Sequence, residues 1–223
     1  MNGRAVLEAM QAAYAGHWFT TLTFVQKTQK QTPDGKKTVE TWYESLRHTE
    51  AAGTQLRIDI GAPSDGNRVI YSAGETHIYR GGKQIAARQG GNALLPLIVG
   101  VYLQPVERTL AELKPTGVDF ARPVVRGEWE DRPVWRVGAA SATDTRSAQF
   151  WVDIERKVVV RAMLVPVPGA PVMDIRLGGM VPLGGGWLAT HCEFLVDGKL
   201  VQVEDYQNWK TGVELPEALF SHG

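Results

Sequence analysis

A two-residue alternation of apolar and polar side chains runs through most of this sequence, and it limits the possible folds more than any other feature. In TQLRIDIG, for example, Leu56, Ile58 and Ile60 alternate with charged side chains. Successive side chains of a β-strand point to opposite faces of a sheet, so this pattern predicts strands with one buried face. Because the strands are short and separated by turn sequences, we expect antiparallel pairing between neighbours.

Turn sequences divide the chain into short strands on both sides of one segment of different character. We predict turns at residues 33–35, 73–74, 81–82, 130–131, 155–156 and 197–198, most of which carry Gly or Asp. Three strands are expected between residues 171 and 209. A short amphipathic helix over residues 4–13, ended by Gly16, precedes the first strand. The expectation is a mainly β, α+β fold: one domain over residues 1–223, with a large curved antiparallel sheet.

The segment at residues 92–114 breaks the alternation. NALLPLIVGVYL is apolar on all sides, and PVERTLAELK opens with Pro105, a residue typical of the first helical turn. We expect a helical insert here, with its sides covered by protein or facing an apolar ligand. Lying across the open side of a curved sheet, it would enclose an apolar cavity. The simpler interpretation is that its apolar residues fill a core.

Nine residues are candidates for contact with an apolar ligand. Trp18, Leu22 and Phe24 share one face of the first predicted strand. The helical insert contributes Leu94, Leu95, Leu97, Ile98, Val101 and Tyr102. An aspartate or an arginine at a strand edge would gate the cavity mouth, and the sequence does not single one out.

A glycine pair followed by lysine raises the possibility of a phosphate-binding loop. The segment Gly81-Gly82-Lys83 does not meet the spacing of such a loop. His77 stands five residues before Gly82, where a glycine is needed, and Gln84 replaces the Ser or Thr that should follow the lysine. The glycine pair is therefore predicted to form a hairpin turn.

No residue pattern indicates catalysis or a metal site. His191 and the single cysteine, Cys192, are adjacent on a predicted strand and so face opposite sides of the sheet. The acidic stretch GEWEDRPVW is interpreted as a solvated hairpin tip, and the sequence has no GxSxG nucleophile motif. We therefore expect no catalytic residues, no cofactor and no metal.

Charge and hydropathy also limit the partners. Lys+Arg and Asp+Glu number 24 each, and a net charge of zero argues against a nucleic-acid partner. The longest apolar run, residues 93–103, is shorter than the roughly 18–20 residues of a transmembrane helix. We therefore expect neither nucleic-acid binding nor a transmembrane segment.

Several motifs, taken in order, resemble those of the LolA/LolB-like superfamily of bacterial lipoprotein-localisation factors. TQLRIDIGAP followed by NRVIYSAGETHIYRGGK resembles a short arginine-bearing strand and the turn-containing segment after it. NALLPLIVGVYL stands where the superfamily has its lid helix. QFWVDIERKVVVRAMLV resembles a strand pair with an aspartate before the turn and a basic residue after it, and LPEALF resembles a common ending.

The resemblance implies an incomplete antiparallel β-barrel of about eleven strands, with a helical lid over about residues 92–114 and an apolar cavity that holds acyl chains. It also implies a periplasmic setting and no catalysis. The chain contains no signal peptide, so we expect its export signal to have been removed. The expected function is a non-enzymatic carrier for lipid acyl chains or lipoproteins. The alternative is a protein-interaction or envelope-stress-sensing module of the same fold, with an envelope protein as partner.

The chain departs from the superfamily pattern in two places. Lipoprotein carriers of this kind have an Arg-Pro pair just before the strand that corresponds to TQLRIDIG, and that arginine helps to control the lid. Here the preceding region is RHTEAAGTQ, with Arg47 somewhat earlier and no proline. At residues 72–75, SAGE replaces the usual Ser-Asp-Gly-Lys.

Overall fold

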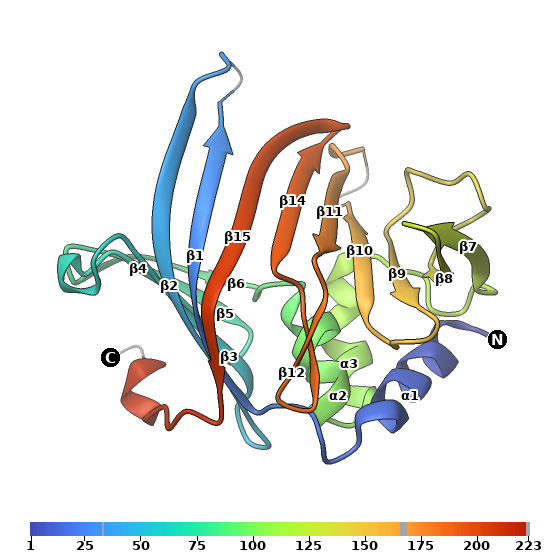
Figure 1. Ribbon diagram of the computed structural model, residues 1–223, viewed down its shortest axis with the longest axis horizontal. Coiled ribbons are helices and arrows are strands. Elements are labelled where there is room, and N and C mark those ends of the chain that lie inside the picture. The colour runs from blue at the N-terminus through green and yellow to red at the C-terminus, as the bar shows by residue number, and fades with distance from the viewer. Residues whose placement is uncertain (33, 166–168, 222–223) are drawn as a thin grey trace.

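The alternating segments form the strands of one antiparallel sheet, as the sequence predicts (Figure 1). The computed structural model describes residues 1–32, 34–165 and 169–221. The strands of the sheet are β1 (Thr21–Gln31), β2 (Lys37–Thr49), β3 (Gly53–Ile60), β4 (Arg68–Ser72), β5 (Glu75–Arg80), β6 (Lys83–Gln89), β7 (Val125–Trp129), β8 (Arg132–Val137), β9 (Gln149–Asp153), β10 (Val159–Leu164), β11 (Met173–Gly178), β14 (His191–Val196) and β15 (Lys199–Thr211).

The sheet consists of two meanders joined along the first and last strands of the chain. Its order is β6-β5-β4-β3-β2-β1-β15-β14-β11-β10-β9-β8-β7, so each meander follows the chain and β1 pairs with β15 between them. The edge strands β6 and β7 do not pair with each other in the described part of the chain, so the sheet stays open. This arrangement is an incomplete barrel.

Most of the helical segments after α1 (Gly3–Tyr14) lie in the connection between the two sheet edges. These segments are the π-helical stretch η2 (Pro96–Gly100), α2 (Val101–Leu103), α3 (Val106–Leu113) and the single 3-10 turns η1 (Pro63–Asp65), η3 (Lys114–Thr116) and η4 (Glu217–Leu219). Residues 90–124 run from β6 at one edge to β7 at the other and contain the helical insert. Figure 1 shows α2 and α3 between the two halves of the curved sheet.

Helix α1 holds the far end of this connection in place. The Asn2 side chain caps α1 by accepting a hydrogen bond from the Ala5 amide at 3.1 Å. The Gly3 amide donates to the carbonyl of Phe120 at 3.0 Å, which fixes the start of α1 to the chain just before β7. Val6, Leu7 and Met10 are fully buried on one face of α1, at the spacing that the sequence predicts.

The structure differs from the sequence prediction in the number and extent of strands. The sheet has thirteen strands rather than about eleven, and a separate two-stranded ribbon, β12 (Val181–Leu183) and β13 (Gly186–Leu188), lies in the region where only three strands were expected. The ribbon strands have three residues each and lie among glycines, so they show no alternation. Pro105 caps α3 rather than occupying its first turn. The turn predicted at 33–35 falls partly on Pro33, which lies outside the described residues.

Trp18 was predicted to lie on the first strand, and this prediction is wrong. It lies in the connection between α1 and β1, which begins at Thr21. The chain leaves α1 through Gly16, whose φ of +74° is accessible to glycine at little energetic cost. The bend places Trp18 before the sheet, although Leu22 and Phe24 do alternate on β1 as expected.

A buried ion pair stabilises the second meander. The Arg161 guanidinium on β10 donates two hydrogen bonds to the Asp174 carboxylate on β11, both at 2.7 Å. The same guanidinium lies over the rings of Trp129 and Trp151, at 4.7 Å and 4.4 Å from their centroids. Both partners are largely removed from solvent, and Arg161 depends on Asp174 for compensation of its charge, whereas Asp174 also accepts a hydrogen bond from Nε of Arg176 at 3.2 Å.

We predict that Asp174→Ala lowers the free energy of unfolding by about 3 kcal/mol, because it leaves the Arg161 charge buried without its carboxylate. Urea unfolding followed by tryptophan fluorescence measures the change. Glu155→Ala, which removes a solvent-exposed ion pair with Arg132, is the control and should leave the midpoint nearly unchanged. Equal destabilisation by the two substitutions would contradict the prediction.

Candidate functional site

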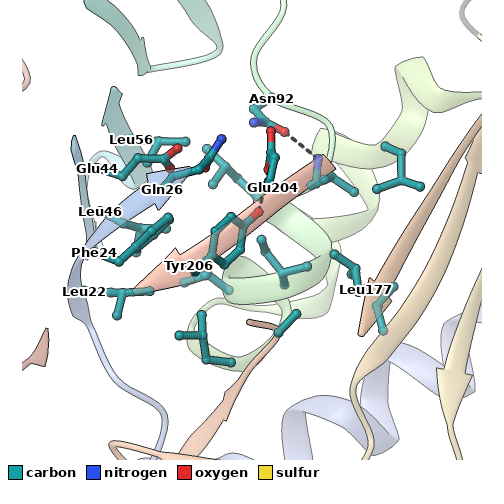
Figure 2. Close-up of a pocket in the computed structure, with 18 of the residues that line it drawn as sticks. Leu22, Phe24, Gln26, Glu44, Leu46, Leu56, Asn92, Leu177, Glu204 and Tyr206 are labelled. Atoms are coloured by element: carbon teal, nitrogen blue, oxygen red, sulfur yellow. Dashed lines mark hydrogen bonds between the residues drawn. The ribbon is translucent and has the colours of Figure 1, made fainter. Parts of the chain in front are cut away.

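A cavity of about 440 Å³ lies between the concave face of the sheet and the helical insert (Figure 2). Its wall on the sheet side is formed by inward-facing residues that alternate along adjacent strands. Leu22 and Phe24 come from β1, Leu46 from β2, Leu56 from β3 and Leu177 from β11. Because alternate residues of a strand face the same side, the pattern seen in the sequence produces a continuous apolar wall.

Seven of the nine candidate residues line this cavity. They are Trp18, Leu22, Phe24, Leu94, Leu95, Ile98 and Tyr102. Leu97 and Val101 do not line it; they are buried elsewhere in the core, so the expectation that they face the cavity is not met. Val99, which was not a candidate, does line it. The π-helical stretch has i→i+5 hydrogen bonds, so the residues that share a face differ from those of the α-helix assumed from the sequence.

One end of the cavity is closed by packed aromatic rings. Trp18 stacks on Tyr102, with ring centroids 3.7 Å apart and planes inclined at 20°. The Tyr102 hydroxyl donates to the Lys157 carbonyl at 3.0 Å, which ties the helical insert to the turn after β9. Gly186 of the β12–β13 ribbon packs against Trp18 so closely that a Cβ at this position would lie 2.6 Å from Cε3 of the indole. The sequence pattern did not predict this contact, because the ribbon itself was missed.

Another part of the lining is polar. The sequence pattern did not predict these polar residues. Figure 2 shows Glu44, Gln26 and Glu204, which come from the neighbouring strands β2, β1 and β15. The Tyr206 hydroxyl donates to Oε2 of Glu204 at 2.7 Å, and Nε2 of Gln202 donates to Oε1 of the same carboxylate at 2.5 Å. We call Gln26, Glu44, Glu204 and Tyr206 the polar cluster.

Burial raises the pKa of both carboxyl groups in this cluster. The pKa of Glu44 lies well above its usual value of 4.5, first because of burial and second because of the negative charge of Glu204. Burial also raises the pKa of Glu204, although hydrogen bonds from Tyr206 and Gln202 act in the opposite direction. Glu44 is 6% exposed and has no hydrogen-bond or ion-pair partner within the described residues.

The strand register explains why these polar groups meet. Glu44 is opposite Phe24 in the β1–β2 pairing, and Glu204 is opposite Thr28 in the β1–β15 pairing. Gln26 lies between these two positions on β1 and is opposite Tyr206. Residues two apart on one strand share a face, so the polar cluster spans three strands on the concave side.

A second cavity, of about 730 Å³, adjoins the first on the other side of the start of the helical insert. Both cavities are lined by Asn92, Ala93, Leu95, Tyr71 and Leu164. The Asn92 side chain accepts a hydrogen bond from the Leu94 amide at 3.0 Å, which orders the entry into the insert. These shared residues therefore form the partition between the two spaces.

Arg47, the arginine nearest to the position where lipoprotein carriers have their lid arginine, binds the C-terminal segment instead. Its guanidinium donates to Oε1 of Gln55 at 2.9 Å and to the Leu215 carbonyl at 3.4 Å, and it lies 4.9 Å from the ring centroid of Phe220. Arg47 does not line either cavity. Its contacts are with the chain terminus rather than with the helical insert.

The described residues contain neither a metal-binding cluster nor a membrane-spanning helix. No group of three or more His, Cys, Asp or Glu residues in that part of the chain is arranged to hold a metal ion. Across the same residues, no helix has both the length and the apolar character needed to cross a membrane.

Several solved structures have a fold similar to that of this chain. No protein-family model and no curated protein sequence matches the chain. A DUF1329 family protein from Desulfovibrio piger has a TM-score of 0.66 and 12% identity, over 99% of this chain and 96% of its own. A domain described as an outer membrane lipoprotein-sorting protein, from Vibrio parahaemolyticus, has a TM-score of 0.66 and 10% identity, over 98% and 95%. A LolA superfamily protein from Nitrosomonas europaea has a TM-score of 0.58 and 13% identity, over 100% and 98%.

These structures show that the chain has a LolA-like fold, which confirms the resemblance seen in the sequence motifs. At identities of 10–13% the likeness extends to the fold alone.

The raised pKa of Glu44 predicts a loss of stability with rising pH. A carboxyl whose folded-state pKa exceeds its unfolded value contributes fully below the unfolded value, and this contribution is lost as pH rises through the folded pKa. Within that window the loss is about 1.4 kcal/mol per pH unit. As the pH rises above the usual carboxyl range, Glu44→Gln should therefore lose less free energy of unfolding than the unmodified protein, as measured by urea denaturation.

The control for this measurement is Glu128→Gln, on the exposed side of β7, which should follow the pH dependence of the unmodified protein. Parallel pH profiles for all three proteins would show that Glu44 is not a source of the dependence.

Proposed function

We propose that this protein is a non-enzymatic carrier that binds an acyl chain of a lipid or lipoprotein between its curved sheet and its helical insert, in the periplasm or cell envelope of a bacterium. The observation that carries the proposal is the apolar cavity enclosed by a LolA-like fold. Its volume of about 440 Å³ is within the roughly 300–1,000 Å³ range of small-molecule sites.

The lining is apolar over most of its area and, within the described part of the chain, offers no serine, cysteine or lysine nucleophile. Among the described residues, those that line the cavity include no Ser, Thr, Cys, His, Lys or Arg. Nucleophilic catalysis by a Ser, Cys or Lys side chain therefore has no candidate residue in the wall. Cys192, on β14, is buried but does not line the cavity, and burial raises the pKa of its thiol.

The apolar wall provides a favourable free energy for a hydrocarbon chain. Each methylene transferred from water into such an environment contributes about 0.8 kcal/mol, which corresponds to about fourfold in affinity. Leu94 and Ile98 of the helical insert and Leu22 and Phe24 of the sheet all line this space. A chain inserted between them would be covered on both sides.

We predict that affinity for primary alcohols rises by about fourfold for each added methylene until the cavity is full, and then becomes constant. Trp18, Trp42 and Trp187 line the cavity, so intrinsic fluorescence and native mass spectrometry can both follow binding. An affinity that does not depend on chain length would contradict the proposal. Recovery of a defined envelope protein without any lipid on native purification would favour the sensing module instead.

Ile98→Asn should weaken binding of a long-chain alcohol by roughly tenfold, because a polar amide would replace an apolar contact inside the cavity. Leu103→Asn, in the same insert, changes a half-buried residue that does not line this cavity, and it should keep the affinity of the unmodified protein. Circular dichroism and unfolding midpoints establish that both variants fold. Equal weakening by the two substitutions would mean that the insert's inner face is not the binding surface.

A further inference from the structure

The polar cluster is an unexpected feature of a cavity whose lining is otherwise mostly apolar. Glu44 is 6% exposed and lines the cavity, and no hydrogen-bond or ion-pair partner for it exists in the described part of the chain. A buried carboxyl group without a partner destabilises the folded state. At the wall of a cavity, the acceptor oxygens of such a group are open to a ligand that occupies the cavity.

The groups around Glu44 define what that partner must be. Glu204 lies close enough for its charge to act on Glu44, and both are acceptors of hydrogen bonds when ionised. Gln202 and Tyr206 already donate to Glu204, whereas Glu44 receives no such bond from the described residues. The cluster therefore combines two carboxyl groups with few donors, and a cationic hydrogen-bond donor would complement it when the carboxyl groups are ionised.

Among the described residues, no cationic side chain lies in the cavity to pair with Glu44. The cavity lining contains no Lys, Arg or His among the described residues. Lys30 is the nearby cation that acts on Glu204, but its ammonium group donates to Oε2 of Glu40 at 2.9 Å and lies 4.8 Å from the ring centroid of Trp42. It is thus engaged outside the cavity, since it is not one of the lining residues.

We propose that Glu44 and Glu204 bind the primary ammonium group of an amphiphile whose hydrocarbon chain occupies the apolar part of the cavity. This inference rests on the proposed function, because it assumes that the cavity takes a chain. An ammonium group has three N–H donors and no acceptor, which complements two carboxylates. Removed from bulk water, such charge-assisted hydrogen bonds are about twice as strong as neutral ones. The same site disfavours a fatty-acid carboxylate, since like charges repel.

The proposal includes a defined pH dependence. The ammonium stabilises the ionised carboxylates, so its affinity should rise with pH as Glu44 and Glu204 lose their protons, as long as the amine itself stays protonated. The titratable and charged groups that interact electrostatically with the pair are Tyr71 on β4, Tyr206 on β15, Cys192 on β14 and, from outside the cavity, Lys30 on β1. Burial raises the pKa of Tyr71, Tyr206 and Cys192, so these groups stay neutral over the same pH range.

The test compares three amphiphiles with the same chain: dodecylammonium, dodecanol and dodecanoate, each below its micelle-forming concentration. We expect dodecylammonium to bind at least about tenfold more tightly than dodecanol at pH 7.5, and dodecanoate to bind most weakly. The difference between dodecylammonium and dodecanol should shrink at about pH 5. Tryptophan fluorescence titration and native mass spectrometry measure the affinities.

Substitution of the carboxyls assigns the preference to them. Glu44→Gln and the double variant Glu44→Gln/Glu204→Gln should lose about tenfold or more of the dodecylammonium affinity while keeping the dodecanol affinity, because the amides have the same shape but no charge. Glu128→Gln, an exposed carboxyl far from the cavity lining, is the matched control and should change neither. Retained binding of dodecanol shows that a variant has folded with its cavity intact.

The outcomes separate this inference from the proposed function. If dodecanol binds with chain-length dependence but the ammonium-to-alcohol ratio is near one, or is unchanged in Glu44→Gln, the ammonium site is wrong and the carrier proposal stands. If none of the three binds, both fail. Two further probes distinguish the sources of the ammonium. Weaker binding of an acylated peptide after acetylation of its N-terminus indicates a lipidated polypeptide. Extraction of phosphatidylethanolamine from vesicles indicates a phospholipid headgroup.

Discussion

The pairing of β1 with β15 is the interaction on which the rest of the structure depends. Residues separated by most of the chain meet there, with Gln26 opposite Tyr206 and Thr28 opposite Glu204. On either side of this pair, each meander is built from hairpins between strands that are neighbours in the sequence, apart from the β12–β13 ribbon. Hairpins form locally, whereas β1–β15 pairing closes a loop that contains nearly all of the sheet, so it turns two separate meanders into one curved surface.

The position of the cavity and of its polar cluster follows from this pairing. Joining the meanders at β1 and β15 leaves β6 and β7 as the two free edges, and the chain between them has to cross the sheet. Because residues 93–103 of that connection are apolar on all sides, this part is buried against the concave face. The central strands then form the cavity wall, and the polar cluster lies where the two meanders meet, on β2, β1 and β15.

Alternation predicted the strands, turn residues predicted most of the turns, and a break in the alternation predicted the helical insert. All three signals depend on neighbours in the sequence. Leu22 and Phe24 line the cavity for the same reason, as two of the seven candidate residues that do so. Alternation carries no information about distant strand partners, so the β1–β15 pairing and the position of Trp18 could not be derived from it. Glu44 was missed although a signal existed: it lies between Trp42 and Leu46 at the spacing of one strand face, which places a carboxyl among apolar side chains. A single carboxyl group on an apolar strand face belongs to no established catalytic or metal-binding motif.

The connection from β6 to β7 has a mechanical consequence. Its start is attached to one sheet edge and its end to the other, and the hydrogen bond between Gly3 and Phe120 anchors the latter end to α1. A ligand that pushes the helical insert away from the concave face must therefore also pull on both edge strands. The curvature of the sheet and the volume of the ligand are thus coupled. A bulky ligand would change the curvature at the edge strands β6 and β7.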